Sequence, residues 1–94
     1  MTGGTSDDTV VLGAAVTSGT INLGAGTDAI TLGNFANTVT LTNIEAITGG
    51  TSTDVVTLGS AVTSGSISLG SGTDTLVLGN FANTLTISNV ETIT

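Results

Sequence analysis

The chain repeats itself once at a fixed distance. A shift of 46 residues lays residues 3–48 onto residues 49–94 without a gap, and 31 of the 46 aligned pairs are identical. Each of the seven glycines in the first copy has a glycine partner in the second. Repeats of this kind form supersecondary units that stack on one another and bury a shared core. The sequence therefore predicts one repeat domain over residues 1–94, built from two 46-residue copies.

Short segments within each copy alternate outward polar and inward apolar residues. They are rich in Val, Ile and Thr and are bounded by Gly, Asn and Ser, which is typical of β-strands separated by turns. Helix is not expected, because no apolar stripe with helical spacing occurs. The predicted strands are residues 9–12, 20–23, 29–32, 38–41, 45–48, 55–58, 66–69, 75–78, 84–87 and 91–94.

The spacing of these strands predicts how they are arranged. Five strands in each copy follow one another about nine residues apart, and no Asn-Gly or Asp-Gly pair favours tight hairpins between them. Short strands with glycine-rich corners favour an all-β fold, a parallel β-solenoid of the β-roll or β-helix type. A two-sided roll is slightly preferred to a triangular coil, and both stay open. The residues expected to face inward are Val10, Leu12, Ile21, Leu23, Ile30, Leu32, Val39, Leu41, Ile47, Val56, Leu58, Ile67, Leu69, Leu76, Leu78, Leu85, Ile87 and Ile93.

The side chains that are missing exclude several classes of function. The chain has no Lys, Arg, His or Cys, and its formal net charge is −7. It therefore lacks the usual general bases, thiolate nucleophiles and phosphate-binding cations. Its charge repels nucleic acids and anionic lipids, and no apolar run is long enough to span a membrane. We expect neither an enzyme, nor nucleic-acid binding, nor membrane insertion.

Four turns resemble a known calcium-binding motif. Residues 23–31 and 69–77 resemble the nonapeptide G-G-x-G-x-D-x-U-x of RTX (repeats-in-toxin) proteins, where U is a large aliphatic residue, and lack only its first glycine. Residues 3–11 and 49–57 keep both leading glycines and have serine in place of the third. The chain is also similar to the Thr- and Gly-rich repeats of bacterial surface-layer proteins and giant adhesins. These resemblances imply a secreted or cell-surface protein, although no signal peptide is visible, and Ca²⁺ in the turns.

The acids of these turns are the candidate calcium ligands. Ca²⁺ takes about six to eight oxygen ligands, and glycine lets a turn curl so that carbonyl oxygens converge on the ion. In a two-sided roll, three of the acids lie on one edge and three on the other, whereas in a three-sided coil Asp28 stacks on Asp54. The alternative is that they are solvated turn residues, because other units have Asn37, Asn83, Gly19 or Gly65 at this position. The candidates are Asp8, Asp28, Glu45, Asp54, Asp74 and Glu91.

Self-association is the first functional expectation. No capping segment precedes residue 9, the chain stops inside a strand, and neither Lys nor Pro protects an edge. Copies are therefore expected to stack into a homo-oligomer or filament, as in a surface layer or an adhesin stalk. Two whole copies also suit an excised or designed pair of repeats. Phe35 and Phe81, expected in turns, would cover a corner or contact a neighbouring molecule.

Two other functions stay open. One is a calcium-binding module that folds or stiffens when Ca²⁺ binds. The other is an ice-binding surface made from the outward threonine pairs Thr38/Thr40, Thr84/Thr86 and Thr92/Thr94. Thr is also simply suited to exposed strand positions, and other residues interrupt the threonine pattern.

Overall fold

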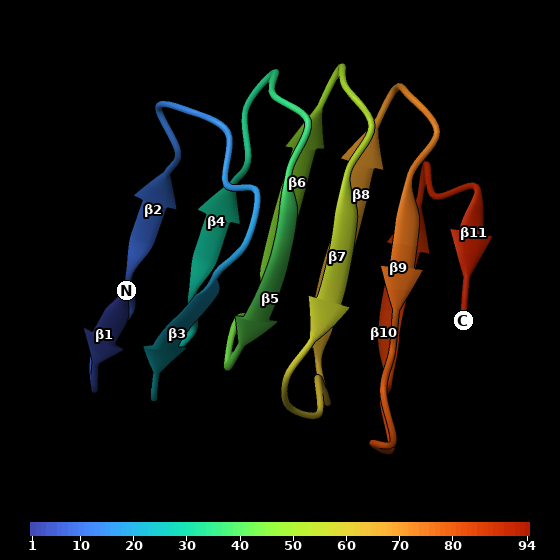
Figure 1. The fold of residues 1–94 in the computed structure, drawn as a ribbon. Coiled ribbons are helices and arrows are strands. Elements are labelled where there is room, and N and C mark those ends of the chain that lie inside the picture. The colour runs from blue at the N-terminus through green and yellow to red at the C-terminus, as the bar shows by residue number, and fades with distance from the viewer.

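The fold is a stack of parallel coils with two β-sheets as its sides. The computed structural model describes residues 1–94 and contains eleven strands. Sheet A holds the odd strands in the order β1-β3-β5-β7-β9-β11, and sheet B holds the even strands from β2 to β10. Figure 1 shows the strands following one another along the stack, with the two termini at opposite ends. The strands are β1 (Thr2–Gly4), β2 (Thr9–Val11), β3 (Thr20–Gly24), β4 (Ala29–Thr31), β5 (Thr38–Thr42), β6 (Ala46–Gly50), β7 (Val55–Leu58), β8 (Gly65–Gly70), β9 (Thr75–Val77), β10 (Leu85–Ser88) and β11 (Thr92–Ile93).

The predicted all-β parallel solenoid is confirmed, and it is the two-sided form. Each predicted strand overlaps one strand of the structure, and every strand pair is parallel. The prediction missed β1, whose Thr-Gly-Gly sequence carries no apolar residue. This strand is held by its register with β3, where Thr2 pairs with Asn22 and Gly4 with Gly24. No helix is present that is long and apolar enough to cross a membrane.

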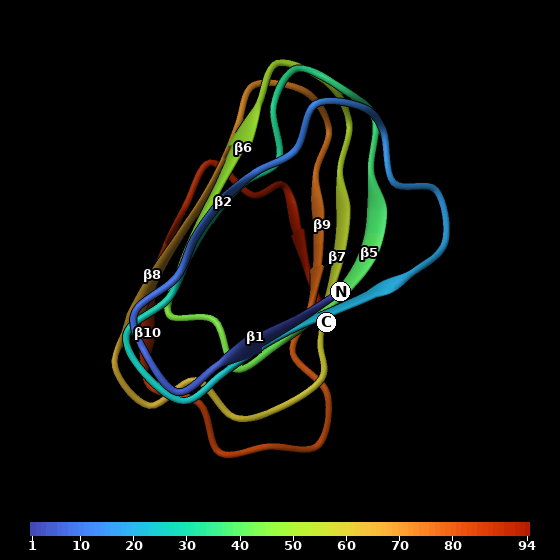
Figure 2. The ribbon, with the colours of Figure 1, turned by 90° about the vertical axis from the view of Figure 1, so that its left-hand side faces the viewer.

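Each coil takes 20 or 17 residues. Thr9 of β2 pairs with Ala29 of β4, 20 residues later, and Ala29 pairs with Ala46 of β6, 17 residues later. Viewed along the stack, the coils lie over one another and enclose a narrow interior (Figure 2). Like residues therefore stack in columns, as in Ile30 on Ile47 on Ile67.

The odd number of strands in each copy makes equivalent residues alternate between the sheets. β5 lies in sheet A, whereas β10, its counterpart 46 residues later, lies in sheet B. In the same way β2 in sheet B corresponds to β7 in sheet A. One copy therefore advances the solenoid by a half-integral number of coils, and two copies restore the original face.

The interior holds the expected aliphatic residues and two that were not expected. Ile44 and Val62 are buried in the core, although both lie in segments between strands. Ile93 lies in register beside the buried Leu76, as its expected inward position requires, but it stays 48% exposed in the last strand because no further coil of this chain covers it. Phe35 and Phe81 lie in turns outside the buried core, where each ring packs against a glycine of its own turn, Gly33 or Gly79.

Candidate functional site

The predicted ligands line the two edges of the solenoid. The first acidic edge consists of Asp8, Asp28 and Glu45, each just before a strand of sheet B. The backbone N–H of Asp8 donates to Asp28 Oδ1 at 2.7 Å, and the N–H of Asp28 donates to Glu45 Oε2 at 2.8 Å. Asp28 and Glu45 therefore each accept a hydrogen bond from the coil before, whereas Asp8 Oδ2 accepts the N–H of Gly4 in its own turn.

The opposite edge carries a longer ladder of the same kind. The second acidic edge consists of Asn37, Asp54, Asp74 and Glu91, each before a strand of sheet A. The N–H of Asp54 donates to Asp74 Oδ1 at 2.7 Å, and that of Asp74 donates to Glu91 Oε2 at 2.8 Å. The six predicted ligands are thus divided three and three between the edges, as the two-sided roll requires.

Glycine is required in these turns because the coils approach closely there. Gly26 has a φ of +124°, a region that disfavours L side chains. A Cβ added to Gly26 would lie 2.6 Å from the carbonyl oxygen of Ser6 in the preceding coil, and one added to Gly24 would collide with Gly4 O. Coil stacking therefore accounts for the G-x-G-x-D spacing without any ligand.

One oxygen of each fully buried aspartate has no partner. Asp28, Asp54 and Asp74 are 0% exposed, and their Oδ2 atoms make no hydrogen bond. Burial raises the pKa of Asp54 above its ordinary value of 3.8, and the Asp74 charge adds to the rise, although hydrogen bonds from Asn37 oppose it. These three oxygens are the atoms that a proton or a cation would satisfy.

The donors available to a cation are few at any one point. No group of three acidic side chains comes close enough together to hold a metal ion. One oxygen of each aspartate is already occupied by an N–H group, so an ion would need the free Oδ2 together with backbone carbonyls and water, which Ca²⁺ accepts. The unpartnered Oδ2 atoms fit a cation in this sense. The six acids stay candidate ligands.

The asparagines of the repeat have a role that the nonapeptide motif does not indicate. Asn37 Oδ1 accepts the N–H of Val16 at 2.8 Å, and Asn83 Oδ1 accepts the N–H of Val62 at 2.8 Å. Both asparagines occupy the position of the aspartate in the nonapeptide-like units. The sequence could have indicated this role through the equivalent positions of Asn and Asp, because an amide oxygen can accept the same backbone N–H as a carboxylate oxygen.

The terminal coils leave apolar residues half exposed that are buried in the middle of the stack. Their counterparts 46 residues away are all core residues, none more than 4% exposed. Each end therefore exposes apolar side chains whose equivalents in the middle of the chain are buried by a neighbouring coil. The half-buried residues are Val10, Leu12 and Val16 at one end and Leu78, Leu85, Ile87 and Val90 at the other.

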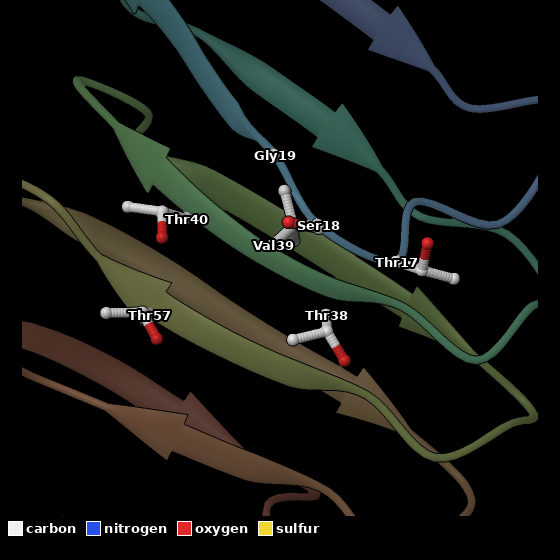
Figure 3. Close-up of a pocket in the computed structure, with 7 residues that line it drawn as sticks. All are labelled: Thr17, Ser18, Gly19, Thr38, Val39, Thr40 and Thr57. Carbon is white, nitrogen blue, oxygen red and sulfur yellow. The ribbon is translucent and has the colours of Figure 1, made fainter.

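The outer face of sheet A is rich in threonine. Two columns cross it, Thr20-Thr40-Thr57-Val77 and Thr38-Val55-Thr75-Thr92, and valine interrupts both. Figure 3 shows Thr38, Thr40 and Thr57 around a hollow of about 160 Å³ that Thr17, Ser18 and Gly19 also line. A second hollow lies on the opposite sheet, lined by the equivalent residues Thr63, Ser64, Gly65, Thr84, Leu85 and Thr86.

No family model, curated protein or solved structure matches this chain. What can be inferred about its function therefore comes from the geometry of the two acidic edges and of the two ends.

Proposed function

We propose that this chain is a structural β-solenoid module that associates with copies of itself end to end. The observation that carries the proposal is the equivalence between its ends and its centre. Val56 and Leu58 are buried by the coil before them, whereas Val10 and Leu12, their counterparts 46 residues earlier, are only partly buried. A second copy stacked in the same way would bury them.

The energetic argument favours such stacking. Complete burial of an aliphatic side chain contributes about 1.5–3 kcal/mol, and seven half-buried side chains share the two ends. The terminal strands also present backbone N–H and C=O groups without partners in this chain, and such an edge is a template for a further strand. The same contacts would join this unit to a further repeat in a longer chain.

The setting that we propose is the outside of a bacterial cell. The resemblance of the turns to RTX repeats and to surface-layer and adhesin repeats supports it. A rigid rod of stacked coils would suit a surface layer, an adhesin stalk or a filament. In each, the stack itself performs the function.

Sedimentation velocity over a thousandfold range of protein concentration tests self-association. The expected result is a monomer at low concentration and a series of longer species as the concentration rises. The control is Val10→Asp, which places a charge in the half-buried surface of the first coil and should stop the growth. A wild-type chain that stays monomeric at millimolar concentration would contradict the proposal.

Calcium binding is the second candidate function, because three buried carboxylate oxygens lack a partner. Asp28 Oδ2, Asp54 Oδ2 and Asp74 Oδ2 each lie inside a glycine-containing turn, where an ion would replace the missing hydrogen bond. A bound Ca²⁺ would also reduce the repulsion between neighbouring carboxylates such as Asp54 and Asp74. An ion of this kind would stiffen the turns and leave the sheets unchanged.

A thermal melt in chelator and then in rising Ca²⁺ tests this candidate. Ligand that binds only the folded state stabilises it by about 2.7 kcal/mol at a hundred times its dissociation constant, so the melting temperature should climb steadily. The matched controls are Mg²⁺, which needs a stricter geometry, and Asp74→Asn. A melting temperature indifferent to Ca²⁺ would leave hydrogen bonding as the role of these acids.

A further inference from the structure

At the junction between the two copies, one pair of residues makes more hydrogen bonds than the other pairs along the second acidic edge. The backbone N–H and the side-chain Nδ2 of Asn37 both donate to Asp54 Oδ1, each at 3.0 Å. Asn37 Nδ2 also donates to the carbonyl oxygens of Leu32 and Phe35. Both Asn37 and Asp54 are buried. One asparagine therefore ties the last coils of the first copy to the first coil of the second.

Each half of this contact recurs at one end of the molecule without its partner. Asn83 is the counterpart of Asn37, and its Nδ2 donates to the carbonyl oxygens of Leu78 and Phe81. Its backbone N–H and Nδ2 have no carboxylate to reach. Asp8 is the counterpart of Asp54, and its own N–H donates to Asp28 Oδ1 as that of Asp54 donates to Asp74. Asp8 Oδ2 accepts the N–H of Gly4 at 3.4 Å, and its Oδ1 accepts no hydrogen bond within this chain.

We propose that Asn83 of one copy binds Asp8 of a second copy and so fixes the register of end-to-end assembly. This inference rests on the proposed self-association and names its specific contact. The backbone N–H and Nδ2 of Asn83 donate to Oδ1 of Asp8, which reproduces the junction between Asn37 and Asp54. The recognised partner is therefore a second copy of this chain.

The same superposition gives the register of the strands. Within the chain Thr40 of β5 pairs with Thr57 of β7. A shift of 46 residues turns this pair into Thr86 of β10 and Val11 of β2 in the next copy. Both β10 and β2 are outer strands of sheet B, so sheet B continues into sheet B across the contact. The strand register and the polar contact thus follow from one superposition. In it Thr94 of the first copy and Thr2 of the second would both lie beside Asn22 of the second, as Thr48 lies beside Ser68, so the two-residue ends must separate from the stack on association.

The chemistry of the contact makes it selective. A hydrogen bond to a charged acceptor is stronger than one between neutral groups, and the chain has no basic side chain that could compete for Asp8. A stack displaced by two residues would bury the Asn83 amide and the Asp8 carboxylate without partners, which costs free energy. Apolar burial therefore drives the association, and this pair selects one register.

The test compares three variants by sedimentation velocity at pH 7. Asn83→Asp replaces the donor by a carboxylate, which faces Asp8 and should weaken association about tenfold. The double variant Asn83→Asp with Asp8→Asn exchanges the partners and should restore it. Asn34→Asp adds the same charge at an exposed residue in the middle of the stack and should have little effect.

The outcomes separate this inference from the proposed function. A wild-type chain that never associates overturns both. A wild-type chain that associates, with Asn83→Asp as strong as wild type, overturns only the register contact. The same holds if the double variant is as weak as the single variant. The expected pattern is loss in Asn83→Asp and recovery in the double variant.

A cross-link measures the register without changing position 83. The chain contains no cysteine, so Thr86→Cys and Val11→Cys can be placed in separate chains, mixed and oxidised. Neighbouring strands lie about 4.8 Å apart, within the range of a disulfide, and we expect a mixed dimer. Thr40→Cys with Thr57→Cys in one chain is the positive control. Equal cross-linking of Thr86→Cys to Thr9→Cys, two residues out of register, would overturn the proposal.

Discussion

At the scale of single residues, the buried side chain of Asp54 does two opposite things. Asp54 Oδ1 accepts hydrogen bonds from Asn37 and so joins two coils. Its Oδ2 is buried without a partner, which disfavours the ionised form. Stacking therefore uses the carboxylate as an acceptor while burial penalises its charge. The balance between these effects depends on pH.

The stability of the fold should rise on mild acidification. Burial raises the pKa of Asp54 in the folded state above 3.8, its ordinary value in the unfolded chain. As the pH falls through the folded-state pKa, the folded state takes up this proton first and gains stability until the unfolded chain also protonates near 3.8. The urea midpoint should therefore be higher at acidic pH than at pH 7.

The variant Asp54→Asn isolates this effect. An amide has no charge to bury, and Asn37 already occupies the ladder, so we expect Asp54→Asn to gain about 1 kcal/mol at pH 7 and to lose much of the pH dependence. Asp7→Asn removes the same charge from an exposed residue and is the control for net charge. Equal pH dependence in Asp54→Asn and wild type would contradict the assignment.

At the scale of strands and coils, the repeat predicts most of the architecture. The alternation of Val, Ile, Leu and Thr placed ten strands, and the 46-residue shift required the two copies to be alike. β1 and the buried Ile44 and Val62 were missed, because a strand without apolar residues and a core residue in a corner carry no alternating pattern. Their positions depend on which coil lies beside them.

The acidic edges were predictable only in part, for the same reason. The sequence placed the acids in turns and divided them correctly for a two-sided roll. It did not indicate that Oδ1 of Asp54 faces the preceding coil or that Asn37 takes part in the same ladder. These features depend on the 17- and 20-residue lengths of the coils, which place Asn37 beside Asp54 in the neighbouring coil.

A pair of leucines should measure how much stacking contributes. Leu58 is 2% exposed and has a coil on both sides, whereas Leu12 occupies the same place in the first coil and is half-buried. We expect Leu58→Ala to cost about 2–5 kcal/mol of unfolding free energy and Leu12→Ala less than about half of that. Urea unfolding at a concentration where the chain is monomeric gives both values. Equal costs would show that the end coil is not the weaker one.

At the scale of the whole molecule, charge opposes assembly while packing favours it. The net charge is −7, and no basic side chain offsets it. Two approaching ends each carry acids, so like charges meet across any end-to-end contact. The strength of association should then depend on how well the solvent screens them.

Association should strengthen with salt at neutral pH. The screening length is about 10 Å at 0.1 M salt and about 30 Å at 0.01 M, and we expect the dissociation constant to fall roughly tenfold between these conditions. The control is the same series near pH 4, where many carboxylates are protonated and the salt dependence should shrink. Association that weakens with salt at pH 7 would contradict the expected repulsion between the ends.

Because each copy advances the solenoid by a half-integral number of coils, equivalent surface features lie on opposite sheets. The hollow at Thr38 and Thr40 opens from sheet A, and its twin at Thr84 and Thr86 opens from sheet B. One such hollow therefore lies on each of the two opposite sheets for every pair of repeats. If copies stack as proposed, the rod would repeat this hollow on both of its faces and not on one alone.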